Sequence, residues 1–141
     1  MSDHQELEDE LGRVVEALEA AGHAQAQELW IPFEARTRAH LDTEDNHLLP
    51  ALFRWRRREA RAIVEEHKHI RGRLVQLAKA IAAKKAKLSE IQRLFDELRA
   101  HARNEERRMY AWADESLNLP AKEALMAALA ASIAVVPRPP F

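Results

Sequence analysis

The sequence predicts an all-α protein, an up-down-up-down four-helix bundle with an extra short helix at the C-terminus. Four long stretches carry apolar residues at the 3.6-residue period of a helix that is buried on one side. Only three of the 141 residues are glycine, 47% are hydrophobic and 32% are charged, as is typical of helical chains. Short breaks separate the stretches, and helices with short connections pack as antiparallel neighbours.

The first two helices are expected to meet at Gly22. Ser2 followed by Gln5 is a capping-box pattern, so the first helix should begin near Asp3, and Gly22 is a typical C-terminal stop. The second helix should follow at once. Pro32 interrupts its pattern, and the sequence leaves open whether this proline kinks one long helix or starts a new one at its first turn.

A second break is expected at Pro50, which should end or bend the second helix. The arginine-rich segment 54–61 is interpreted as a solvated connection and helix start, because no DNA-reading motif accompanies it. The third apolar stripe then runs to Ile81. Ser89 with Gln92 forms another capping box, which predicts the start of the fourth helix.

The domain organisation follows from these breaks. At 141 residues the chain is too short for two ordinary domains, and the bundle is expected to cover residues 1–118. Leu119-Pro120 breaks the pattern. Residues 119–136 should form the extra apolar helix, which packs on the bundle or at an interface with a second copy or a separate signalling partner. Residues 137–141 are a proline-rich tail.

Composition excludes several classes of protein. The net charge of −1 gives no reason to expect nucleic acid or a membrane surface as partner. No apolar run reaches the ~18 residues of a membrane helix. The chain has no cysteine, which excludes disulfides and thiolate metal sites and fits the reducing cytoplasm, the expected location. The N-terminus is polar and acidic, unlike a secretory signal.

Two of the apolar stripes contain a histidine and a glutamate one turn apart. His40 and Glu44 lie on the inward face of the second helix, and His101 and Glu105 repeat this spacing in the fourth. A lone inward histidine is more often a hydrogen-bonded core residue than a ligand. Two such pairs in one core are much harder to obtain by accident.

Distances from the turns place further histidines at the same height. His4 and His40 are equally far from Gly22, and His67 and His101 are equally far from Lys84. In antiparallel helices such pairs should lie level. Imidazole and carboxylate ligands suit iron, manganese or zinc, and two buried carboxylates would repel each other without a cation. The sequence therefore predicts a metal site with six ligands: His4, His40, Glu44, His67, His101 and Glu105.

These residues resemble the hemerythrin-like (HHE cation-binding) family. The resemblance spans residues 3–117 and rests on four segments, which are His4 in an early helix, the run from His40 to Pro50, the run from Glu66 to Arg71, and His101-x-x-x-Glu105-Glu106. It implies a four-helix bundle around a non-haem di-iron centre with an oxo or hydroxo bridge. A mononuclear iron, manganese or zinc site is the alternative.

The resemblance also implies roles for the ligands. Glu44 and Glu105 would bridge the two irons, the pair His4 and His40 would hold one iron, and the pair His67 and His101 would hold the other. The expected function is to bind or sense dioxygen, nitric oxide or peroxide, or to handle iron. A weak oxidase or peroxidase activity would be an enzymatic version of the same chemistry.

One position departs from the oxygen-carrying pattern of the family. That pattern has a second histidine one turn further along the third helix, where this chain has Arg71, and a guanidinium cannot coordinate a metal. Three alternatives stay open. The second iron keeps an open or water-filled position, or His47 supplies the ligand. Otherwise Arg71 pairs with Glu44 or Glu105 and replaces a metal charge, which leaves a mononuclear centre or a metal-depleted interaction module.

Overall fold

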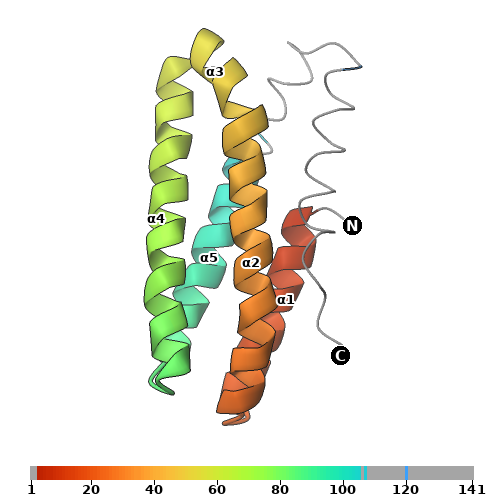
Figure 1. The fold of residues 1–141 in the computed structure, drawn as a ribbon, viewed down its shortest axis with the longest axis vertical. Helices are drawn as coiled ribbons and strands as arrows, with labels where there is room; N and C mark the ends of the chain where they lie inside the picture. The colour runs from red at the N-terminus through yellow and green to blue at the C-terminus, as the bar shows by residue number, and fades with distance from the viewer. Residues whose placement is uncertain (1–2, 106, 108–119, 121–141) are drawn as a thin grey trace.

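The computed structural model describes residues 3–105, 107 and 120, and shows four long helices that run alternately up and down (Figure 1). The prediction of an all-α, up-down-up-down bundle is confirmed, and this part of the chain contains no strand. The expected C-terminal helix and tail, residues 119–141, lie outside the described residues except for residue 120. The helices are α1 (Asp3–Glu19), α2 (His23–His47), α3 (Leu49–Trp55), α4 (Arg57–Ala82) and α5 (Leu88–Glu105).

The turn between α1 and α2 closes near Gly22, but a different residue adopts the left-handed backbone. Ala21 has a φ of 57°, whereas Gly22 has a φ of −89°. The Gly22 N–H donates to the Ala17 carbonyl at 2.8 Å, and a side chain at Gly22 would meet that oxygen at 3.3 Å. Glycine at position 22 therefore allows the Ala17 carbonyl to approach closely. It does not supply the positive φ that is usual for a glycine at the C-terminus of a helix.

Helix α2 is continuous through Pro32, so the proline does not start a new helix. The missing N–H removes one hydrogen bond of the helix. The neighbouring side chains of Trp30 and Phe33 are only 2% and 0% exposed, and their burial holds the segment in place.

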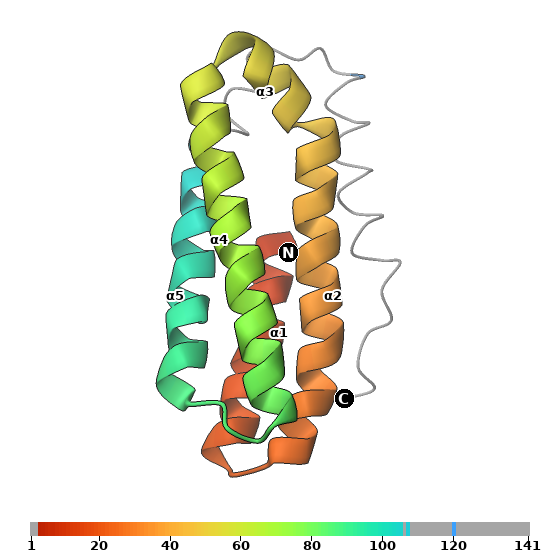
Figure 2. The ribbon, with the colours of Figure 1, turned by 60° about the vertical axis from the view of Figure 1, so that its left-hand side comes forward.

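The other breaks lie close to their predicted positions. Pro50 lies in the first turn of α3, a short helix that the sequence did not predict. Figure 2 shows α3 crossing from α2 to α4 at one end of the bundle. The predicted capping box at Ser89 is wrong, because α5 already begins at Leu88 and the N–H groups of its first turn donate to the carbonyl of Lys87.

Apolar residues fill the bundle on both sides of a buried polar layer. The larger cluster occupies the end at the two tight turns and includes Phe33, Leu74 and Leu94. The smaller cluster lies under α3 and includes Leu52 and Ile63. The polar layer contains the predicted metal ligands, so apolar packing shields it from water along the bundle axis.

A buried ion pair within the bundle was not predicted. The Arg36 side chain on α2 is fully buried and pairs with Glu10 on α1, whose side chain is 10% exposed. Arg36 lies one turn before His40. Among the described residues, no helix is both long and apolar enough to cross a membrane.

Candidate metal centre

The four long helices deliver all six predicted ligands to one region of the bundle. His4 comes from α1 and is the most accessible, with a side chain 13% exposed. Each of the others is at most 6% exposed. Helix periodicity points them inward, and the equal distances from the turns bring them level. The five buried residues are His40, Glu44, His67, His101 and Glu105.

The pairs predicted to lie level are in close proximity. The Nε2 atoms of His4 and His40 are 3.1 Å apart, and the rings of His67 and His101 lie 5.0 Å apart between centroids. Nε2 of His67 is 3.4 Å from Oε1 of Glu44. Pro32 does not disturb the first alignment, because α2 stays helical through it.

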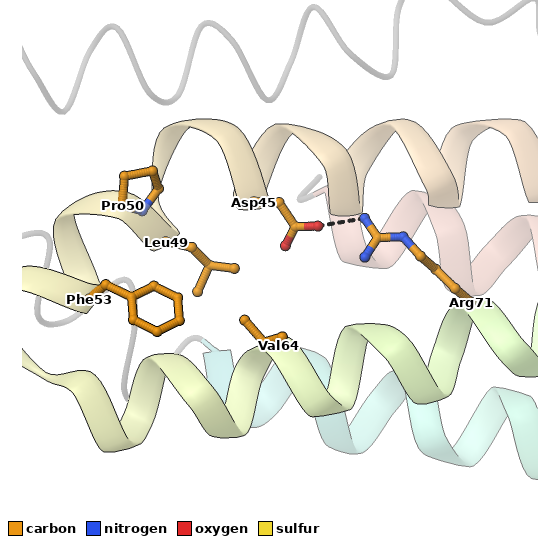
Figure 3. Close-up of a pocket in the computed structure, with 6 residues that line it drawn as sticks. All are labelled: Asp45, Leu49, Pro50, Phe53, Val64 and Arg71. Atoms are coloured by element: carbon orange, nitrogen blue, oxygen red, sulfur yellow. Dashed lines mark hydrogen bonds and ion pairs between the residues drawn. The ribbon is translucent and has the colours of Figure 1, made fainter.

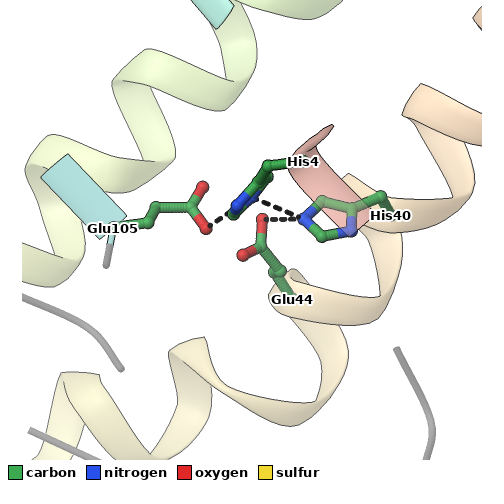
Figure 4. Close-up of side chains that lie close together, drawn as sticks. All are labelled: His4, His40, Glu44 and Glu105. Atoms are coloured by element: carbon green, nitrogen blue, oxygen red, sulfur yellow. Dashed lines mark hydrogen bonds and ion pairs between the residues drawn. The ribbon is translucent and has the colours of Figure 1, made fainter. Parts of the chain in front are cut away.

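The residues form two overlapping groups that share two carboxylates. In each group, one nitrogen or oxygen from every member lies within 4.8 Å of the others. Figure 4 shows the first group, with both carboxylates beside the two imidazoles. The groups are His4, His40, Glu44 and Glu105, and Glu44, His67, His101 and Glu105.

Two further carboxylates bind the outer nitrogens of the second pair of histidines. Nδ1 of His67 lies 2.7 Å from Asp45, and Nδ1 of His101 lies 2.7 Å from Glu66. A carboxylate that accepts a hydrogen bond from Nδ1–H keeps the proton on Nδ1 and so leaves the Nε2 lone pair for a metal, as is usual for metal-binding histidines. This donor set fits a metal ion. Asp45 and Glu66 were not predicted as site residues, although each directly adjoins a predicted ligand in the sequence.

Without metal, the two shared carboxylates have opposite pKa shifts. Burial and the charge of Glu44 hold the pKa of Glu105 well above its usual range. Burial also acts to raise the pKa of Glu44, but hydrogen bonds with Glu105, His40 and His67 hold it well below its usual range. A proton on this pair therefore favours Glu105, and Glu44 is the carboxylate that ionises first, as expected for two buried carboxylates in contact.

The histidines also differ from one another. Burial, together with the nearby His40, lowers the pKa of His4 to about 4. Burial opposes the charged form of His67 as well, but hydrogen bonds with Glu105 and Glu44 raise its pKa to about 9. At neutral pH His4 is therefore ready to coordinate, whereas His67 must lose a proton before its Nε2 can bind a metal.

A scan against protein-family models finds a match to the hemerythrin HHE cation-binding domain over residues 1–129. The chain belongs to this family. An HHE domain implies a metal-binding helical protein, and the two histidine–glutamate groups can hold a metal. A search of curated proteins and a search of solved structures found no significant match.

Within this HHE domain, Arg71 points away from the shared carboxylates. Its guanidinium donates to Asp42 at 2.8 Å. It also donates to Asp45 at 2.6 Å (Figure 3). The expected alternative in which Arg71 pairs with Glu44 or Glu105 is therefore wrong. The carboxylates of Asp42 and Asp45 lie nearer the surface than those of Glu44 and Glu105. Arg71 binds the outer pair because its guanidinium keeps part of its hydration there.

The alternative in which His47 replaces the missing histidine is also not supported. His47 is the last residue of α2, its side chain is exposed, and it belongs to neither histidine–glutamate group. Although it lies one turn from Glu44, the helix ends there and the next segment turns away into α3. Neither Arg71 nor His47 therefore replaces the histidine that the oxygen-carrying pattern has at position 71.

Proposed function

We propose that the six residues hold two iron ions, and that the protein binds dioxygen, nitric oxide or peroxide, or handles iron. The observation that supports this proposal most is the sharing of Glu44 and Glu105 between two groups of donors. A single ion needs only one group. Two carboxylates between two pairs of imidazoles match a pair of cations and balance part of their charge.

The donor types favour iron and an exchangeable ligand. Two histidines with carboxylates and open positions are typical of non-haem iron sites that react with oxygen. Bound iron would supply the Lewis-acid and redox chemistry needed to bind such ligands. The residues of the chain set the geometry, and the apolar clusters that include Leu52 and Phe33 limit the access of water. The outward position of Arg71 leaves the His67 and His101 side without a third histidine, which favours an open position there.

The proposal is tested by loading the purified protein with Fe²⁺ under anaerobic conditions and then admitting air. We expect about two iron ions per chain and the near-ultraviolet charge-transfer bands of a bridged ferric pair. In separate samples kept anaerobic, nitric oxide or peroxide added to the ferrous protein should also change the spectrum. About one ion per chain would replace the proposal with a mononuclear centre. Failure to bind iron, manganese and zinc would contradict it altogether.

Metal loading at neutral pH should release protons. His67, with a pKa of about 9, must lose the proton on Nε2, and Glu105, with a raised pKa, must ionise. Loading at pH 7 should therefore release about one proton from His67, and any proton that Glu105 holds adds to it. Because protons leave, raising the pH strengthens binding, and the release should shrink above pH 9. Calorimetric titrations in buffers of different ionisation enthalpy measure the number of protons that are released on metal binding. Metal loading without proton release would show that His67 and Glu105 are already deprotonated in the metal-free protein.

A further inference from the structure

The two sides of the proposed centre differ in whether a carboxylate binds the outer nitrogen of a buried histidine, and the contrast rests on His40. We call His67 and His101, with the shared carboxylates, the α4–α5 half, and His4 and His40 with the same carboxylates the α1–α2 half. In the α4–α5 half both Nδ1 atoms lie 2.7 Å from a carboxylate oxygen. In the α1–α2 half, Nδ1 of His40 is buried and has no hydrogen-bond partner in the part of the chain that the structure describes.

Asp45 is itself held by Arg71, which stands where the oxygen-carrying pattern has a histidine. One oxygen of Asp45 lies 2.7 Å from Nδ1 of His67, and the other accepts from Arg71 at 2.6 Å (Figure 3). The side chains of Arg71 and Asp45 are 30% and 29% exposed, whereas that of His67 is 1% exposed. A chain of guanidinium, carboxylate and imidazole therefore leads from the surface to the buried centre.

We infer that Asp45 and Glu66 are positioning residues for the α4–α5 half, that Arg71 holds Asp45 in place, and that this half binds its metal ion first and more tightly. A carboxylate on Nδ1 fixes the orientation and tautomer of the ring and strengthens electron donation from Nε2. His40 lacks such a partner among the described residues. The inference rests on the proposed function, because it states which half takes the first ion.

The test is a titration of the metal-free protein with Co²⁺ alone, whose absorption reports its coordination, in the presence of a competing chelator. Asp45→Ala and Glu66→Ala should each weaken the tighter binding step by about 10–100-fold and leave the weaker step unchanged. Asp45→Asn keeps a hydrogen-bond acceptor and should restore part of the affinity. Arg71→Gln should weaken the same step by less than Asp45→Ala.

Asp42→Asn is the matched control. Asp42 also accepts from Arg71 at 2.8 Å, but its side chain is 64% exposed, and within the described part of the chain its ion-pair partner is Arg71. Both binding steps should stay unchanged in this variant. Thermal unfolding of each metal-free variant checks the fold. Asp45 and Glu66 lie on different helices, so a variant that does not fold leaves the other to decide the question.

The outcomes separate the inference from the proposed function. If Asp45→Ala and Glu66→Ala weaken both steps equally or neither step, the inference is wrong while a two-ion centre stands. If the wild type takes up a single ion, the inference requires that Asp45→Ala weakens it and that His4→Ala does not. If the wild type binds no ion, the proposed function fails, and the inference fails with it.

Discussion

If the proposed centre holds two metal ions, Glu44→Gln should abolish binding of both, whereas His4→Ala should remove only one. Glu44 belongs to both groups of donors, and His4 belongs to one. The amide has nearly the same shape as the carboxylate but carries no charge and cannot bridge two cations. We expect iron content to fall from about two ions per chain to less than ~0.2 in Glu44→Gln and to about one in His4→Ala. Elemental analysis after anaerobic loading measures these values.

The exposed His47 provides the control for this experiment. It lies one turn from Glu44 but outside both groups of donors, so His47→Ala should retain both ions. Circular dichroism of the metal-free variants checks that the helices are intact. Two ions retained in Glu44→Gln would show that this carboxylate is not shared between them.

Arg36→Met should lower the free energy of unfolding by ~3–5 kcal/mol. The Arg36 side chain is fully buried, and the variant would leave the Glu10 carboxylate, 10% exposed, without its guanidinium partner. A buried charge that loses its partner costs several kcal/mol because it has also lost its hydration. Urea unfolding of the metal-free protein measures the change.

Two variants identify the cause of this loss. The double variant Arg36→Met with Glu10→Leu removes both charges and should recover most of the stability, because apolar residues of similar size can replace a buried pair. Arg38→Met breaks a more exposed ion pair with Glu34, at 3.4 Å, and should cost less than ~1 kcal/mol. A similarly small effect of Arg36→Met would mean that water or another group compensates the carboxylate.

The six candidate ligands were predictable because each depends on local helix geometry. The apolar stripe around His40 and Glu44 shows which face points inward, and a regular rise per residue converts distance from a turn into height. Neither property requires knowledge of the neighbouring helix. The same reasoning placed the breaks near Gly22 and Pro50, although it missed α3, a helix of only two turns.

The role of Arg71 could not be predicted in the same way. Its position on α4, one turn after His67, is compatible with a side chain that points to the shared carboxylates or to the surface. A long, flexible side chain can reach either, and the choice depends on which carboxylates a neighbouring helix presents. Asp42 and Asp45 of α2 offer two acceptors near solvent, and the guanidinium binds them.

From its sequence alone, this chain could be assigned to a helical bundle with a layer of four histidines and two glutamates, because helical periodicity and turn positions are local properties. The contacts that surround this layer depended on the packed bundle. Asp45 and Glu66 bind histidines on other helices, as Glu10 binds Arg36. Such pairs form only when the rotation of each helix about its axis is set, and that rotation results from the packing of the whole core.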